Sequence, residues 1–255
     1  MRPPGSVRDQ ALTFLKLVAD DLRWSLLQEL GRSDLRVNEL IAGLGQPGNL
    51  VSYHLGQLRS AGLIRERRSS ADGRVVYYSL DLERFQRHLM EAASCIRPGL
   101  LTGHLPARAP GGRRARILFL CTHNSARSQM AEGLLRAMAG DRVTVESAGS
   151  QPTELHPLAV ETMARRGIDI RGQRPKHADG LVGRRFDIVI TLCDSIREVC
   201  PTFTGSPELV HWSLPDPARE AVLEDMRAAF EQVAEEISRR VRYLVILLDE
   251  RLAPT

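Results

Sequence analysis

Hydrophobic residues in the first third of the chain recur at helical spacing and are punctuated by glycine. Apolar residues between Ala11 and Leu30 predict two helices, and Gly31 marks their end. A short amphipathic helix follows over residues 37–44, and another over about 50–58 is closed by Gly62. Two short helices on either side of the break at residues 46–48 predict a helix-turn-helix.

Shorter, strand-like segments follow this motif. Residues 63–68 and 74–80 predict two strands joined by the turn Asp72-Gly73, which together form a hairpin wing. A last helix is expected from about Leu82 to Ser94. Residues 97–114 contain three prolines, four glycines and four arginines without a sustained period. We therefore expect a domain at 8–95, a linker at 96–115 and a second domain at 116–250.

The second half alternates strand-like and helical segments. Strands are expected over residues 117–120, 143–147, 187–192 and about 209–212. Helices are expected over 126–139, 157–166, near 177–184 and from 220 to about 248. Strands separated by helices predict a parallel sheet. The expected fold class is thus α/β in two domains: an N-terminal winged helix-turn-helix and a C-terminal four-stranded parallel sheet flanked by helices.

Composition and charge change this picture only slightly. A length of 255 residues with 43% hydrophobic content supports packed cores. Residues 1–114 hold 17 Lys/Arg against 11 Asp/Glu, and the remainder holds 18 against 20, so +6 and −2 sum to +4. Four positive charges of the first half lie in the expected linker, so charge is weak evidence for a polyanionic partner.

Hydropathy and cysteine content point to a cytoplasmic protein. Residues 1–10 contain no apolar run, so we expect neither a signal peptide nor a transit peptide. The apolar stretch 243–248 is too short to cross a bilayer, so no membrane partner is expected. Four cysteines argue against a disulfide framework and leave catalysis, redox work, metal binding or burial.

The main chemical pattern is a strand that runs into Cys121 and a helix that begins near Arg127. Five residues separate the two, which lets the loop curl so that backbone N–H groups and the guanidinium converge on a tetrahedral oxyanion. The same field predicts a lowered pKa and a nucleophilic thiolate at Cys121, whereas a simple buried cysteine is the alternative. The expected oxyanion-binding loop comprises Thr122, His123, Asn124, Ser125, Ala126 and Arg127, with Ser128 beside the arginine.

The stretch 118–132 resembles the signature of the low-molecular-weight phosphatase and thioredoxin-coupled arsenate reductase superfamily. Asp216, within Leu-Pro-Asp-Pro, matches the acid that protonates a leaving group, with an ordinary turn as the alternative. The segment from Cys193 to Cys200, with six residues between the thiols and Pro201 after them, resembles the redox segment of the arsenate reductases. A metal site would need more thiol or histidine ligands near these cysteines, so we expect no metal site.

This resemblance implies a relay of three thiols. Cys121 attacks arsenate while Asp216 helps water to leave, Cys193 then attacks Cys121 and releases arsenite, and Cys200 takes the disulfide to the Cys193–Cys200 pair, where thioredoxin reduces it. No tightly bound cofactor is implied. Two alternatives stay open: a phosphatase, which has no use for the second and third cysteines, and a regulator whose second domain only senses oxyanion or redox state.

Some members of this superfamily hold a potassium ion beside the loop. The matching ligands here are Asn124, Glu132 and Ser147, but the fourth, an acid in those members, corresponds to Lys176. We expect the lysine ammonium to replace the cation, so that activity does not depend on potassium.

Residues 8–94 resemble the ArsR-type winged helix-turn-helix repressors. The resemblance rests on Val51-Ser52-Tyr53-His54-Leu55, Leu58, Ala61-Gly62-Leu63-Ile64 and the wing that ends Asp72-Gly73-Arg74-Val75-Val76-Tyr77-Tyr78. It implies a double-stranded DNA operator and a homodimer formed through this domain, and the alternative is a module used only for dimerisation. The candidate DNA contacts are Gln46, Asn49, Ser52 and Tyr53 for base edges and Arg67, Arg68 and Arg74 for phosphates.

The sensor cysteines of such repressors are absent. Where arsenite-binding members often carry a Cys-Val-Cys-Asp type segment, this chain has residues 36–39, Arg-Val-Asn-Glu. Cys95 is either part of an inter-subunit site or an idle cysteine, and the inducer is not evident. The sequence as a whole predicts a bifunctional chain, a repressor joined to an arsenate reductase.

Overall fold

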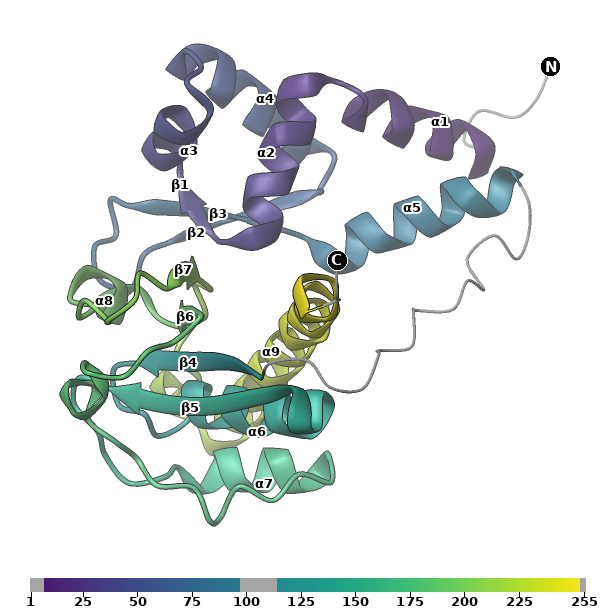
Figure 1. Cartoon of the computed structure of the whole chain (residues 1–255). Helices are drawn as coiled ribbons and strands as arrows, with labels where there is room; N and C mark the ends of the chain where they lie inside the picture. Colours follow the sequence, from purple (N-terminus) through teal and green to yellow (C-terminus); the bar gives the residue numbers. More distant parts are fainter. Residues whose placement is uncertain (1–6, 97–113, 253–255) are drawn as a thin grey trace. The chain divides into compact units, whose positions relative to one another are not determined.

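The computed structural model describes residues 7–96 and 114–252 of the chain (Figure 1). The chain divides into two compact units, residues 1–107 and 108–255, and each is considered by itself. The expected linker at 96–115 lies, apart from its ends, outside the described residues. Within the described residues no helix is long and apolar enough to span a bilayer.

The N-terminal unit is a helical domain with a small antiparallel sheet, which confirms the expected helix-turn-helix and wing. Its helices are α1 (Val7–Val18), α2 (Asp21–Arg32), α3 (Val37–Leu44), α4 (Gly48–Ser60) and α5 (Leu82–Ile96). Its strands are β1 (Leu35–Arg36), β2 (Ile64–Arg68) and β3 (Val76–Leu80), in the order β1-β3-β2. Strand β1 was not predicted, because two residues are too few to show a period.

Local chemistry explains where these helices begin and end. The Asp20 side chain accepts a hydrogen bond from the backbone N–H of Arg23 at 2.9 Å and so caps α2. Helix α3 ends at Gly45, whose φ of 62° lies in the left-handed region that glycine adopts without strain. Helix α4 buries Val51, Leu55 and Leu58 in the core of the domain. The opposite face of α4 is thereby left exposed.

The turn of the wing is shifted by one residue from the predicted Asp72-Gly73 position. Backbone N–H of Val75 donates to the Asp72 carbonyl at 2.9 Å, so Gly73 and Arg74 are the central residues of the turn. The backbone N–H of Ser69 donates to the Val75 carbonyl at 2.8 Å, which joins the two ends of the loop between β2 and β3. The turn is therefore centred one residue later than the predicted Asp72-Gly73, within the expected longer connection between β2 and β3.

The C-terminal unit contains a four-stranded parallel sheet with flanking helices, which confirms the expected fold class. Its strands are β4 (Ala115–Cys121), β5 (Val143–Gly149), β6 (Ile188–Thr191) and β7 (Glu208–His211), in the order β5-β4-β6-β7. Its α-helices are α6 (Arg127–Ala139), α7 (Pro157–Arg165), α8 (Asp194–Glu198) and α9 (Leu223–Leu252). Three 3-10 turns add η1 (Gly140–Arg142), η2 (Ala178–Leu181) and η3 (Pro217–Arg219).

Two segments of this unit differ from the prediction. The helix expected near residues 177–184 is only the turn η2, because Gly180 and Gly183 disfavour a longer helix and only Ala178 and Leu181 are buried. Helix α8 was not predicted. It lies between Cys193 and Cys200, and its five residues are too short for a recognisable helical period.

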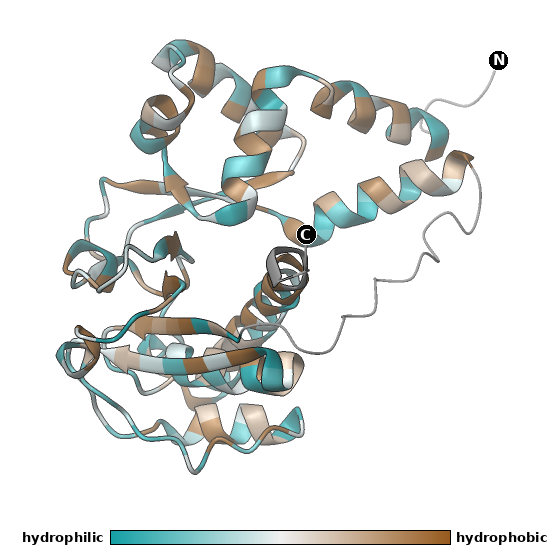
Figure 2. Ribbon diagram, in the orientation of Figure 1, coloured by the Kyte–Doolittle hydropathy of each residue, from teal (hydrophilic) through white to brown (hydrophobic). Residues whose placement is uncertain are grey.

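The sheet places the end of its central strand at a sheltered position. Strand β4 lies between β5 and β6, and residues 117–120 are completely buried. Helix α6 packs against β4, β5 and α9, and Figure 2 shows the mixture of hydrophobic and hydrophilic positions along these elements. Because ligand sites of open parallel sheets lie at the carboxyl ends of the strands, Cys121 at the end of β4 is well placed for one.

Candidate active site

The loop after β4 curls around the sulfur of Cys121, as its spacing predicts. The Sγ atom lies 2.9 Å from the Ser128 hydroxyl, and the backbone N–H of Asn124 donates to it at 3.2 Å. Ser128 is in the first turn of α6, so the helix begins immediately beside the sulfur. His123 is exposed, consistent with a loop side chain rather than a catalytic base. The loop therefore surrounds one buried thiol with hydrogen-bond donors.

Asn124 fixes the shape of this loop. Its φ of 45° is in the left-handed region, which asparagine tolerates better than most residues. Its side-chain amide donates to the hydroxyls of Ser128 at 2.8 Å and Ser147 at 2.9 Å, and its side-chain oxygen accepts from the backbone N–H of Lys176 at 2.8 Å. A fully buried side chain with partners on both sides holds the loop in one conformation.

Strand β5 approaches the same loop so closely that only glycine fits at its end. A Cβ atom at Gly149 would lie 2.5 Å from the carbonyl oxygen of Thr122 and 2.9 Å from the backbone nitrogen of Asn124. Both neighbours are backbone atoms and cannot rotate away. Beyond Gly149 the chain continues along the loop: the backbone N–H of Gln151 donates to the Thr122 carbonyl at 2.9 Å.

Arg127 and Asp216 form the charged part of the site. The guanidinium is buried, donates to the Leu214 carbonyl at 3.1 Å and pairs with the Asp216 carboxylate at 3.0 Å. Asp216 follows β7 in the chain and caps η3 by accepting from the backbone N–H of Ala218 at 3.3 Å. The structure thus brings together Cys121, Arg127, Ser128 and Asp216 from two separate segments.

The predicted lowering of the Cys121 pKa is not what the structure supports. Burial raises the pKa of the Cys121 thiol above its ordinary value, and the charge of Arg127 and hydrogen bonds from Ser128 only partly offset this. The neighbouring Cys193 thiol also raises the pKa of Cys121. The direction of the Cys121 pKa shift is therefore opposite to the predicted one.

Cys193 lies beside the loop, whereas Cys200 does not contact it. The Cys193 Sγ atom is 3.2 Å from the Thr122 hydroxyl, and its thiol is close enough to Cys121 to interact electrostatically. Cys200 is partly buried at the other end of α8, with its Sγ atom 3.7 Å from the Pro201 carbonyl. Burial raises the pKa of the Cys200 thiol. All three thiols are free.

Lys176 lies beside Glu132, one of the expected potassium ligands. Its Nζ atom lies 3.9 Å from Glu132 Oε2, the oxygen that accepts a hydrogen bond from the Ser147 hydroxyl at 2.6 Å. The other oxygen of Glu132 pairs with Arg136 at 2.6 Å. Glu132 therefore pairs with two cationic side chains, Arg136 and Lys176.

Two features of the site escaped the sequence analysis. His156 donates its backbone N–H to the Ser125 carbonyl at 2.9 Å, and its ring stacks on Phe230 at 4.7 Å between centroids. Burial lowers the pKa of His156, and the charge of Asp216 opposes that shift. Pro157 after His156 signals a helix start but gives no sign of the neighbouring loop. The second feature is a buried polar cluster around Asp194, to which no sequence motif pointed.

The predicted DNA contacts lie on the exposed surface of the N-terminal unit. Gln46, Asn49, Ser52 and Tyr53 are all exposed, and the last three are on α4. Arg68 and Arg74 are exposed in the wing, whereas Arg67 is half-buried and donates to the Arg68 carbonyl at 3.0 Å. His54, on the same helix, is buried and lies 3.6 Å from the Asp20 carboxylate.

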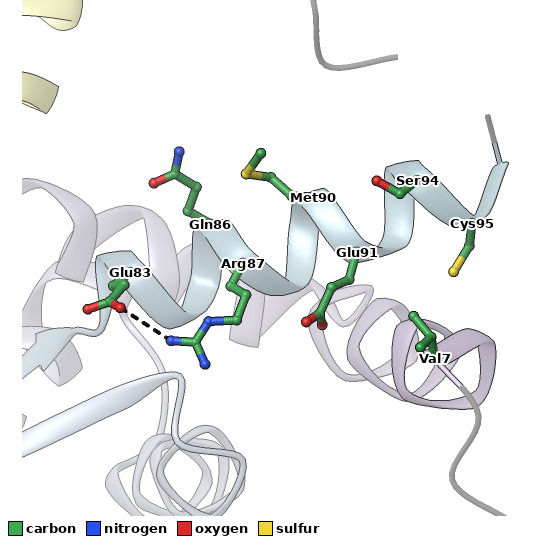
Figure 3. Close-up of a pocket in the computed structure, with 8 residues that line it drawn as sticks. All are labelled: Val7, Glu83, Gln86, Arg87, Met90, Glu91, Ser94 and Cys95. Atoms are coloured by element: carbon green, nitrogen blue, oxygen red, sulfur yellow. Dashed lines mark hydrogen bonds and ion pairs between the residues drawn. The ribbon is translucent and has the colours of Figure 1, made fainter. Parts of the chain in front are cut away.

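Cys95 lies in a groove between α5 and α1. Figure 3 shows Cys95 and Glu91 on the side of α5 that faces Val7 of α1, with an ion pair of 3.4 Å between Glu83 and Arg87 further along. Among the described residues no cluster of three or more His, Cys, Asp or Glu side chains is suited to hold a metal ion. Cys95 is exposed and free.

Comparison with protein families matches each half of the chain to a different group. A family model described as low molecular weight phosphotyrosine protein phosphatase matches residues 116–253. The MarR family model matches residues 20–75. The helix-turn-helix resemblance of the N-terminal unit is thus confirmed, under the MarR name rather than the expected ArsR-type name.

Individual relatives match the C-terminal half. The arsenate reductase of Halalkalibacterium halodurans is 42% identical over 127 residues, which are 49% of this chain and 91% of that protein. The arsenate reductase of Bacillus subtilis is 40% identical over 127 residues, with the same coverage of 49% and 91%. A solved thioredoxin-dependent arsenate reductase of Corynebacterium glutamicum is 35% identical and covers 54% of this chain and 63% of its own, with a TM-score of 0.45.

Proposed function

The chain belongs to the low molecular weight phosphotyrosine protein phosphatase family, and we propose that its C-terminal unit reduces arsenate to arsenite with three cysteines in succession. The proposal draws on relatives that are arsenate reductases and on one observation above all. The Cys193 thiol lies beside the loop that holds Cys121, 3.2 Å from Thr122. A phosphatase mechanism has no use for a second thiol at that position.

The first step takes place in the loop. Backbone N–H groups of the loop and the Arg127 guanidinium bind arsenate above Cys121, and Arg127 exchanges its contact with Asp216 for the oxyanion. The Cys121 sulfur attacks arsenic and an As–O bond breaks. Asp216 delivers the proton with which that oxygen leaves as water. Arsenic remains in its oxidised state, bound to Cys121.

The next two steps are thiol exchanges. The Cys193 thiolate attacks Cys121 Sγ, an S–S bond forms, and the S–As bond breaks with its electron pair leaving on arsenite. The Cys200 thiolate then attacks Cys193 Sγ and expels the Cys121 thiolate, which leaves a Cys193–Cys200 disulfide. An external dithiol, which we propose to be thioredoxin, reduces this disulfide in the reducing cytoplasm.

The second exchange requires α8 to change shape. Cys193 precedes this helix and Cys200 follows it, and the hydrogen bonds of the two sulfur atoms point to different partners. A helix of five residues has little stability of its own. Unwinding α8 should therefore cost little free energy, and it would bring Cys200 to Cys193.

NADPH consumption with thioredoxin, thioredoxin reductase and arsenate tests the proposal. The full chain is compared with Cys121→Ser, Cys193→Ser and Cys200→Ser, and Cys95→Ser is the matched control because Cys95 is remote from the loop in sequence and lies on α5. We expect sustained turnover for the full chain and the control only. Unchanged turnover in Cys193→Ser, or binding of arsenate without turnover in the full chain, would contradict it.

We infer that the N-terminal unit is a DNA-binding regulatory domain. Its match to the MarR family and the exposed side chains of Asn49, Ser52 and Tyr53 on α4 support this. These side chains have the right size and polarity to contact base edges, while Arg68 and Arg74 in the wing supply charge for phosphates.

Binding of the full chain to duplexes selected from a random library tests the DNA contacts. Asn49→Ala should change the selected sequence, at a cost of about 1–3 kcal/mol for the preferred site. Arg74→Ala should weaken binding to all duplexes and reduce the salt dependence by about one counterion. If neither substitution had its expected effect, the alternative of a module that serves only dimerisation would be favoured.

Two helices of this unit offer a surface for a second copy of the chain. Leu12 and Leu15 of α1 and Leu89 and Met90 of α5 are all exposed, and α1 packs against α5. Figure 2 shows hydrophobic positions interspersed along both helices. We propose that these helices form the homodimer contact, and Leu12→Asp with Leu89→Asp should convert a dimer to a monomer in analytical ultracentrifugation.

A further inference from the structure

A fully buried carboxyl group directly follows Cys193 in the chain. One oxygen of Asp194 accepts a hydrogen bond from the Ser213 hydroxyl at 2.6 Å and contacts His211 Nε2 at 3.1 Å. Asp194 has no exposed surface, and His211 and Ser213 are also buried. A buried carboxyl group is costly to desolvate, so its retention beside a reactive thiol needs a reason.

The same cluster also includes a residue on the other side of Cys193. His211 Nδ1 lies 2.8 Å from the hydroxyl of Thr191, the last residue of β6. The backbone N–H of Trp212 donates to the Thr191 carbonyl at 2.8 Å, so β7 and the residue after it are held to the end of β6. Thr191, Asp194, His211 and Ser213, which we call the Asp194 cluster, thus fix the chain both before and after Cys193.

We propose that Asp194, with His211 and Ser213, is a positioning residue that holds Cys193 Sγ toward Cys121 for the first thiol exchange. The inference rests on the proposed function. The Thr122 hydroxyl contacts the sulfur from the loop at 3.2 Å, and the Asp194 cluster anchors the first turn of α8 from the side of β7. These hydrogen bonds are made to Asp194 at the start of α8, whereas Glu198 at its end is exposed, so we expect the end nearer Cys200 to unwind while Cys193 stays in place.

The two exchanges make different demands on this anchor. In the first, the Cys193 thiolate must approach Cys121 Sγ in line with the S–As bond that breaks, and the electron pair leaves with arsenite. Both sulfur atoms sit in rigid surroundings, so a displacement of Cys193 costs rate directly. In the second exchange the Cys200 sulfur moves to Cys193, and this movement depends on unwinding of the end of α8 nearer Cys200.

A single-turnover experiment on the full chain tests this role. Fully reduced protein is mixed with arsenate without thioredoxin, samples are quenched with acid, and arsenite and disulfides are quantified. We expect Asp194→Ala to slow arsenite release about 100-fold, as for a catalytic group displaced by about 1 Å. Protection of Cys121 from iodoacetamide by inorganic phosphate should remain as in the unchanged chain, because it depends on the loop alone.

Three further variants separate positioning from general damage. Asp194→Asn keeps an oxygen that accepts from Ser213 and His211, so its rate should stay within about threefold of the unchanged chain. Ser213→Ala removes the hydrogen bond from the Ser213 hydroxyl to Asp194 and should slow release about tenfold. Ser195→Ala, on the same turn of α8 but outside the cluster, is the matched control and should have no effect.

Failure of the positioning role and failure of the proposed function give different results in this experiment. If the unchanged chain released no arsenite and formed no disulfide, the three-thiol relay itself would be wrong. If the unchanged chain turned over once and Asp194→Ala did so equally fast, the positioning role would be overturned. If Asp194→Ala also lost the protection of Cys121 by phosphate, the Ser213→Ala variant would decide. Slow arsenite release with intact protection in Ser213→Ala would support the positioning role, and an unchanged release rate would refute it.

Discussion

The Cys121 loop and the Cys193–Cys200 segment differ in how firmly they are held. The loop is surrounded by buried partners, and Asn124 alone connects it to Ser128, Ser147 and Lys176. The segment from Cys193 to Cys200 is buried in its first part, at Asp194 and Ile196, whereas Glu198 and Val199 near its end are exposed. The loop is therefore held throughout, whereas the segment from Cys193 to Cys200 reaches the surface just before Cys200.

This difference matches the chemistry that each element performs in the proposed relay. Binding and attack on a tetrahedral oxyanion need preorganised donors, which a rigid loop provides. Passing a disulfide from a buried thiol to an accessible one needs a displacement of several residues. In the proposed relay, Cys193 is thus the point at which a firmly held loop meets a segment that must change shape.

Removing the Cys200 thiol should have the largest effect on turnover. Cys200→Ser leaves the loop and Cys193 intact, so we expect one equivalent of arsenite per protein and a trapped Cys121–Cys193 disulfide, with steady-state turnover reduced about 1000-fold or more. Mass spectrometry of alkylated samples identifies the trapped pair. Continued turnover in this variant would show that thioredoxin reduces the first disulfide directly.

Removing the main support of the rigid loop should have the next largest effect. Asn124→Ala leaves buried hydroxyl and N–H partners without the side chain and puts alanine at a positive φ, so the free energy of unfolding should fall by about 3 kcal/mol. Urea unfolding of the full chain, followed by Trp212 fluorescence in a Trp24→Phe background, measures it.

Asn124→Gly separates the two contributions to that loss. Glycine accepts the positive φ but provides no side-chain hydrogen bonds, so it should be about 1 kcal/mol more stable than Asn124→Ala. Equal stability of the glycine and alanine variants would show that the backbone conformation carries no strain.

The raised pKa of Cys121 predicts how the rigid site responds to pH. Because burial favours the protonated thiol, the thiolate fraction should rise about tenfold per pH unit from neutral pH, and alkylation of Cys121 should still increase where that of free cysteine levels off. Iodoacetamide rates between pH 6 and pH 10, resolved by peptide mapping, measure this. A plateau below the ordinary thiol pKa would contradict the direction of the shift.

The smallest effect is expected from the cation beside the loop. With Lys176 Nζ already 3.9 Å from Glu132, exchanging Na⁺ for K⁺ should change the turnover rate less than about twofold. Lys176→Met, which keeps the length of the side chain, is the control. A strong increase with K⁺ in the unchanged chain would mean that the ammonium does not substitute for the ion.

Several elements could be predicted because their signals are local. The spacing of Cys121 and Arg127 after a buried strand predicted a loop around the sulfur, and the strand and helix pattern predicted the parallel sheet. Helix α8 and strand β1 were missed because they are too short to show a period. The helix expected near 177–184 was wrong because apolar spacing overestimated a segment rich in glycine.

The amino-acid sequence by itself determined which residues carry the chemistry: the three thiols, the arginine and the acid all occur in local patterns. Tertiary structure alone decided what surrounds them. The pairing of Arg127 with Asp216, the burial that raises the Cys121 pKa, and the Asp194 cluster all join residues far apart in the chain. Local patterns encode backbone conformation, whereas burial and electrostatic balance depend on neighbours that only the folded chain brings together.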